Sequence, residues 1–210
     1  MLIDIVFPEN NEDEFIKIAV KLGYNAICFA YKFDKSKNEK QKELIKEKQK
    51  NSELKLYLGI LADFNEIGKA KNSSDLVLVQ NSEKNREVLE SGKADILFDL
   101  EAQNKRDFMH HRASGLNHIL CTFAKKNDLK IGLSFSSILK SSDRHQLVGR
   151  MSQNIKLCRK YKVKMCIASF AKKPYEMRSP NDLMSLFETI GMHPKEAKDS
   201  FKAVFRKDEI

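Results

Sequence analysis

The chain has few of the residues on which common binding motifs depend. Its four cysteines form no Cys-x-x-Cys pair, which argues against a structural zinc site or a disulfide. Its eight glycines include no Gly-x-Gly, so a glycine-rich phosphate loop is not expected. No apolar run is long enough to cross a bilayer, and no basic segment with an apolar run opens the chain. We therefore expect a soluble, cytoplasmic protein with no membrane partner.

The sequence also lacks a convergent catalytic set. The serines of residues 134–137 form no Gly-x-Ser-x-Gly nucleophile elbow. After the first expected strand, where metallohydrolase barrels usually carry a His-x-His pair, the chain reads Phe7-Pro8-Glu9. His111 and His118 are seven residues apart, about 10 Å along a helix, so they are not expected to share one ion. We expect the protein itself to bind no metal and no cofactor.

Positive charge is concentrated in the second half of the chain. Residues 1–100 carry 16 basic and 18 acidic side chains, a net charge of −2, whereas residues 101–210 carry 22 and 11, a net charge of +11. Seven of the eight arginines also lie in this second half. Because the planar guanidinium binds phosphate through two donors and stacks on bases, this distribution favours a nucleic-acid-binding face over charge that only confers solubility.

Apolar strands alternate with helices along the whole chain. Seven strands are expected near residues 2–7, 25–30, 56–61, 76–79, 96–98, 131–135 and 165–168, each followed by a helix. This alternation predicts parallel pairing and one domain over residues 1–210, a TIM-barrel-like (β/α)8 fold or a slightly incomplete barrel. The eighth strand is weak and is placed near Ala203–Phe205.

Three helices can be placed more closely. One helix after residue 113 is expected to turn Leu116, Ile119, Leu120 and Phe123 inward. The helix of residues 143–161 carries a stripe made of Leu147, Met151, Ile155 and Cys158. Ser179 followed by Pro180 predicts the start of a third helix, which Gly191 ends.

The segment Arg106–Cys121 is the strongest candidate for a binding site, because it gathers arginines, histidines and an asparagine before a helix. A second basic cluster surrounds Tyr175, which could stack on an unpaired base or simply pack. Arg86, on a neighbouring helix, could extend the first group. The predicted RNA-binding residues are Arg86, Arg106, His111, Arg112, Asn117, His118, Lys172, Lys173, Tyr175 and Arg178. The alternative for the first segment is a plain loop and amphipathic helix with half-exposed histidines.

Four stretches of this chain together resemble the archaeal ribonuclease P protein component 3, the counterpart of the 30-kDa subunit of eukaryotic nuclear ribonuclease P. They are His110-His-Arg-Ala-Ser-Gly-Leu-Asn-His118, Ile131-Gly-Leu-Ser-Phe-Ser136, Met151-Ser-Gln-Asn-Ile-Lys-Leu-Cys-Arg-Lys-Tyr-Lys-Val163 and Tyr175-Glu-Met-Arg-Ser-Pro-Asn-Asp-Leu183. The first half of the chain matches more loosely, through Asp4 and the strand pattern.

The resemblance implies a TIM-like barrel related to metallohydrolases, serving in the ribonucleoprotein that removes the 5′ leader from precursor tRNA. In such an assembly the catalytic centre belongs to the RNA, which uses Mg²⁺. The protein would stabilise that RNA together with a small partner subunit and other ribonuclease P proteins, and would meet precursor tRNA indirectly. The resemblance does not say which basic residues contact RNA.

Two other functions remain open from the residues. The first is a stand-alone metal-dependent phosphoesterase that uses Asp4, Asp63, Asp99 and Glu101; bound transition metal and RNA-free hydrolysis would favour it. The second is a protein-interaction scaffold whose basic face meets an acidic partner, which purification without nucleic acid would favour. For Asp99 and Glu101, we expect carboxylates that are hydrogen-bonded or solvated rather than bound to a metal ion.

Overall fold

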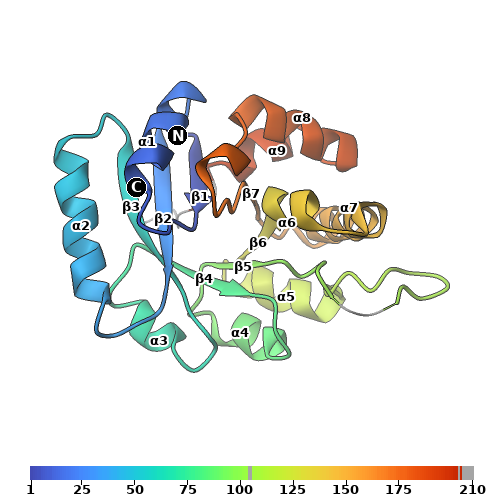
Figure 1. The fold of residues 1–210 in the computed structure, drawn as a ribbon. Helices are drawn as coiled ribbons and strands as arrows, with labels where there is room; N and C mark the ends of the chain where they lie inside the picture. Colours follow the sequence, from blue (N-terminus) through green and yellow to red (C-terminus); the bar gives the residue numbers. More distant parts are fainter. Residues whose placement is uncertain (104–105, 203, 205–210) are drawn as a thin grey trace.

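Seven parallel strands form one sheet that curls into a nearly closed barrel. The computed structural model describes residues 1–103, 106–202 and 204 (Figure 1). The strands pair in sequence order and comprise β1 (Ile3–Val6), β2 (Ala26–Lys32), β3 (Lys55–Leu61), β4 (Leu76–Gln80), β5 (Ile96–Phe98), β6 (Lys130–Ser134) and β7 (Met165–Ala168). A parallel bridge between Val6 and Ala171 brings the first and last strands together, and the Phe7 N–H donates to the Ala171 carbonyl at 2.8 Å.

Helices surround this sheet (Figure 1). They comprise α1 (Glu12–Lys21), α2 (Asn38–Lys50), α3 (Ile67–Ala70), α4 (Asn85–Ser91), α5 (His118–Lys126), α6 (Phe135–Lys140), α7 (Arg144–Tyr161), α8 (Pro180–Ile190) and α9 (Pro194–Ser200), with a short 3-10 helix η1 (Pro174–Glu176). The connection between β5 and α5 reaches away from the barrel. Among the described residues, none of the helices combines the length and apolar character that a bilayer crossing requires.

Side chains fill the barrel, so the interior is a packed core and not a channel. Alternate strand residues such as Ile3, Ile5 and Cys28 form an inner apolar cluster, while their neighbours pack outward against the helices. Phe98 and Phe170 stack in this inner cluster at the carboxyl ends of β5 and β7, with ring centroids 4.5 Å apart. Gly132 allows this arrangement, because a Cβ there would lie 2.7 Å from the Cβ of Phe98.

The predicted strands and the stripe of α7 are confirmed. Leu147, Met151, Ile155 and Cys158 are all buried. The predicted start of α8 is also confirmed, since the Ser179 hydroxyl accepts the Asp182 N–H at 3.2 Å and Pro180 is the first helical residue.

The predicted inward face of α5 is partly wrong. Ile119 is 44% exposed, whereas Cys121 and Ala124 are fully buried. The helix begins only at His118, and the residues that it buries are Cys121 and Ala124, three residues apart. A helix was expected after each strand, but the short helices α3 and α6 were not placed from the sequence. The eighth strand expected near 203–205 lies outside the described residues, apart from Val204.

Candidate nucleic-acid interface

The connection between β5 and α5 starts with two carboxylates that turn in different directions. Asp99 has a left-handed backbone (φ 61°) and accepts hydrogen bonds from Gln80 Nε2 and the Ser137 hydroxyl at the end of the barrel. Glu101 is fully buried and accepts a 2.8 Å hydrogen bond from Asn154 Nδ2 of α7. Burial raises the pKa of Glu101 to about 7, against the lowering effect of the Asn154 hydrogen bond.

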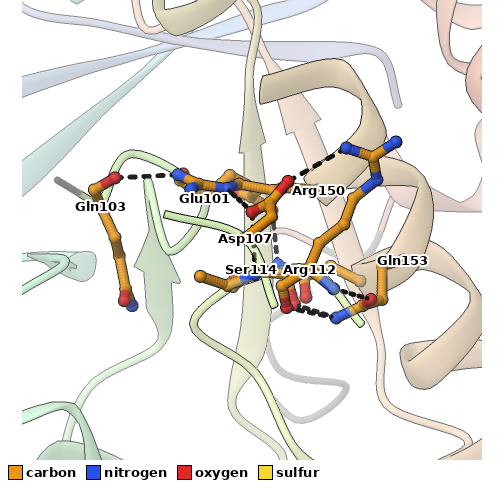
Figure 2. Close-up of polar contacts among 9 residues, drawn as sticks. Glu101, Gln103, Asp107, Arg112, Ser114, Arg150 and Gln153 are labelled. Atoms are coloured by element: carbon orange, nitrogen blue, oxygen red, sulfur yellow. Dashed lines mark hydrogen bonds and ion pairs between the residues drawn. The ribbon is translucent and has the colours of Figure 1, made fainter. Parts of the chain in front are cut away.

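Arg150 of α7 holds the next part of this connection (Figure 2). Its side chain is only 3% exposed, and its Nη1 donates to the carbonyls of Glu101 at 3.1 Å and Gln103 at 2.8 Å. Its Nε donates to the Asp107 carboxylate at 2.8 Å. A buried guanidinium is stable only when its charge is paired and its donors find acceptors; here Asp107 pairs the charge, and both Nε and Nη1 donate. Arg150 therefore fixes the path of the loop.

Gln153 and Asn154, on the same side of α7, complete the support. The Gln153 side chain accepts the Arg112 N–H at 2.9 Å and donates to the Arg112 carbonyl at 3.0 Å, as in a β-ladder. Asn154 Nδ2 also donates to the Ser114 carbonyl at 2.9 Å. Three neighbouring side chains of one helix thus hold the main chain of a long loop at several points. Figure 2 labels two of them, Arg150 and Gln153.

The outer part of the loop presents basic and apolar side chains to solvent. Arg106 and His111 are exposed there, and the Phe108 N–H donates to the His111 carbonyl at 2.9 Å, closing a turn. The rings of Phe108 and His111 stack with centroids 4.5 Å apart. Phe108 is 59% exposed and Met109 is 94% exposed. This apolar pair was not anticipated from the sequence.

Arg112 lies at the base of that turn. Its guanidinium is half-exposed and forms an ion pair with Asp107 at 3.0 Å. It also lies directly against Gly149 of α7, where a Cβ would approach Arg112 Cζ to 2.5 Å. The position of the Arg112 guanidinium against α7 therefore depends on a glycine.

The predicted residues at the start of α5 and on α4 lie on the neighbouring surface. Asn117 caps α5, because its Oδ1 accepts the Leu120 N–H at 2.9 Å, so only its NH₂ group is left to donate. His118 is exposed as the first residue of α5. Arg86 of α4 pairs with Glu90 at 2.9 Å and lies over the Phe123 ring of α5 at 5.9 Å. The two helices thus bring Arg86 next to α5, as the sequence suggested.

The second basic cluster lies around η1, between β7 and α8. Tyr175 is 85% exposed, which contradicts a role in packing, and Lys172 and Lys173 are exposed beside it. Arg178 is held in place, since its Nη1 donates to the carbonyls of Tyr175 at 3.0 Å and Met177 at 2.7 Å. Its guanidinium also lies over the Phe135 ring of α6. Arg178 therefore shapes the turn that presents Tyr175.

The four carboxylates of the phosphoesterase alternative do not converge. Asp4 is buried inside the barrel and accepts the N–H groups of Ser169 and Ile5; burial raises its pKa to about 6. Asp63 is exposed after β3, whereas Asp99 and Glu101 are hydrogen-bonded on opposite sides of the loop. Over residues 1–103, 106–202 and 204, no three His, Cys, Asp or Glu side chains are grouped so that they could hold a metal ion.

The fold and this surface define a class: a TIM-like barrel that carries a supported basic loop and, in its described part, no metal-ligand cluster. The family model of RNase P subunit p30 matches residues 1–207. The chain belongs to this family, whose members are protein subunits of ribonuclease P, as the sequence predicted. The phosphoesterase alternative is not favoured.

Curated relatives agree with this assignment. Ribonuclease P protein component 3 of Methanosarcina acetivorans is 34% identical over 145 residues, which are 67% of this chain and 57% of that protein. The protein of the same name from Methanococcus maripaludis strain C5 is 31% identical over 199 residues, 90% of this chain and 81% of that one. The protein from Methanosarcina barkeri is 30% identical over 93% of this chain and 81% of its own.

Two solved structures share the fold. One is a chain in the cryo-EM structure of archaeal ribonuclease P with mature tRNA, with a TM-score of 0.80, 24% identity, and coverage of 96% of this chain and 87% of that chain. The other is histidinol phosphate phosphatase from Lactococcus lactis, complexed with zinc, L-histidinol and phosphate, with a TM-score of 0.61 and 9% identity over 91% of this chain and 94% of its own.

Proposed function

We propose that this chain binds and stabilises the catalytic RNA of ribonuclease P, together with a small partner protein subunit and other ribonuclease P proteins. The assembly removes the 5′ leader from precursor tRNA, and the chain meets that substrate only indirectly. The chemistry takes place on the RNA, with Mg²⁺ bound there, and the protein contributes no cofactor. The proposed location is the cytoplasm, with the RNA.

The observation that carries this proposal is the supported loop between β5 and α5. A loop that presents Arg106, His111 and Arg112 would lose conformational entropy on binding RNA if it were free to move. Here Arg150, Gln153 and Asn154 of α7 already hold its main chain, so the order exists before RNA arrives. Such preorganisation suits a protein that fixes the shape of an RNA.

The η1 cluster gives the surface a second contact of a different kind. The exposed ring of Tyr175 can stack on an unpaired base, while Lys172 and Lys173 supply charge for nearby phosphates. Arg178 acts there mainly by shaping the turn, because its guanidinium donates both of its hydrogen bonds among the described residues to carbonyls of its own segment. The remaining predicted contacts, Arg86, Asn117 and His118, lie along α4 and α5.

The test is a salt titration of binding to the cognate ribonuclease P RNA. If about five phosphates are neutralised, the log of the affinity falls against the log of the salt concentration with a slope of about −3 to −4. Arg112→Ala should reduce both the affinity and the steepness of the slope. An affinity that does not change with salt would contradict the proposal.

A further inference from the structure

A cavity of about 620 Å³ opens at the carboxyl ends of the barrel strands. Residues that end or follow all seven strands line it, from Phe7 after β1 to Lys172 after β7. Barrels of this type place their ligand sites at this edge. The volume falls within the range of roughly 300–1,000 Å³ that is typical of small-molecule sites, which is large enough for one nucleotide. We call this cavity the barrel mouth.

Aromatic rings form the floor of the barrel mouth. Phe98 and Phe170 are buried and stack on each other, and Phe7 lies next to both with centroids 6.0 and 6.1 Å away. Phe7 is the partly exposed member of the group. The rings close the barrel below the cavity, so a ligand that enters meets an aromatic surface, which favours a flat ring system.

Hydrogen-bonding groups lie on one wall of the mouth. Asp99 keeps its carboxylate there through a left-handed backbone, a conformation that costs free energy in a residue other than glycine. Gln80 Nε2 donates to Asp99 Oδ2 at 2.8 Å, and the Ser137 hydroxyl donates to Oδ1. Each carboxylate oxygen can accept more than one hydrogen bond, so both can still accept from the N–H groups of a base edge.

The rim of the mouth is slightly positive, with four lysines and three carboxylates among the lining residues. Two of these lysines have carboxylate partners: Lys37 with Asp34 at 3.6 Å, and Lys140 with Glu176 at 2.9 Å. In the part of the chain that the structure describes, the ammonium groups of Lys32 and Lys172 have no carboxylate oxygen within 4.0 Å, although the Lys172 backbone N–H donates to Glu176 Oε2 at 3.0 Å. Their ammonium groups are available for a phosphate.

We infer that the barrel mouth holds one unpaired nucleotide of RNA, with its base over Phe7, its base edge at Asp99 and Gln80, and its phosphate at Lys32 and Lys172. This inference rests on the proposed function, because it takes the RNA of the assembly as the source of the nucleotide. Lys32 and Gln80 belong to the first half of the chain, so the RNA surface would take in more of that half than Arg86 alone.

Site-specific photocrosslinking in the reconstituted ribonuclease P tests this inference. The photoreactive residue p-benzoylphenylalanine replaces Phe33 at the mouth, Met109 in the β5–α5 loop, or Lys55 at the opposite end of the barrel. We expect the Phe33 position to crosslink to one unpaired nucleotide and the Lys55 position to crosslink to none.

The Met109 position separates the two proposals. Crosslinking from Met109 without any from Phe33 would overturn the inference and leave the proposed function intact. Absence of crosslinks from both positions, with no retention of RNA by the chain, would contradict the proposed function and the inference together.

A second measurement uses the four free nucleoside 5′-monophosphates as probes for the full chain, with binding followed by NMR chemical shifts. Gln80→Trp fills the mouth from an exposed position and should weaken binding by about tenfold or more, because the base loses its stacking surface. Glu83→Trp, an exposed substitution just outside the mouth, is the matched control and should bind like the unchanged chain. Equal binding by both variants, or no binding by the unchanged chain, would contradict the inference.

Discussion

Replacing Arg150 by methionine should release the β5–α5 loop while leaving the barrel folded. Methionine keeps the apolar stem that packs in α7. Among the described residues it removes three hydrogen bonds, two to loop carbonyls and one to Asp107. Hydrogen bonds from a charged donor each contribute about 1.5–3 kcal/mol. The Asp107 carboxylate is partly exposed and keeps Arg112 as a partner, so its share is smaller. The two carbonyl bonds alone therefore predict a loss of about 3–6 kcal/mol of local stability.

That loss should appear mainly in the loop, because a segment can open without unfolding the whole domain. Trypsin should cleave after Arg106 and Arg112 faster in Arg150→Met, while the midpoint of thermal unfolding falls by only a few degrees. RNA affinity should fall about tenfold or more, since RNA must then order the loop itself. Arg150→Lys should be intermediate, because an ammonium group keeps the charge without the planar fork.

Arg144→Met is the matched control. It removes the same charge from the same helix, but at an exposed position whose guanidinium donates only to the Leu139 carbonyl among the described contacts. The contribution of loop support is the difference between the two variants in RNA affinity and in the rate of trypsin cleavage. If Arg150→Met bound RNA as tightly as Arg144→Met, and trypsin cleaved both loops at the same rate, the role assigned to Arg150 would be refuted.

Three further predictions follow from the same surface and from the barrel core. Burial raises the pKa of Glu101 from 4.5 to about 7, so the folded state favours its protonated form and the free energy of unfolding should fall by about 3 kcal/mol at most as pH rises between these values. Urea titrations of Glu101→Gln should show no such fall. If the variant and the unchanged chain had the same pH profile, this prediction would be contradicted. Gly149→Ala should leave the midpoint of thermal unfolding unchanged or raise it slightly, because alanine favours helix. Filter binding should nevertheless show RNA affinity reduced about as much as in Arg112→Ala, because the new Cβ displaces the Arg112 guanidinium. Gly132→Ala should destabilise the barrel by about 1–3 kcal/mol through overcrowding beside Phe98 and Ile96, and calorimetry that showed no loss would contradict the packing described.

The sequence was informative where one physical signal dominated. The stripe of α7 was predictable because four apolar side chains recur at helical spacing, and the start of α8 because a hydroxyl precedes a proline. The strands were predictable because parallel strands buried on both faces are short continuous apolar runs. The prediction that Ile119 faces inward was wrong, because the sequence of the preceding loop did not show that α5 begins at His118.

The support of the loop was not predicted, although the sequence holds a signal for it. Arg150 and Asn154 occupy positions next to Met151 and Ile155 on the buried stripe of α7, where polar side chains need partners. Their spacing shows that partners exist but not which distant segment supplies them, because Glu101, Gln103 and Ser114 lie about 40–50 residues earlier in the chain. The exposure of Phe108 and Met109 depends on the path of the same loop.

The central claim is that this chain assists an RNA that performs the cleavage. The most direct measurement is leader removal from precursor tRNA by the cognate RNA and partner subunits, with and without this chain, as a function of Mg²⁺ concentration. We predict that adding the chain lowers the Mg²⁺ required, because its basic surface offsets phosphate repulsion in the folded RNA, and that the chain free of RNA cleaves nothing. Cleavage of precursor tRNA by the RNA-free chain would contradict the account.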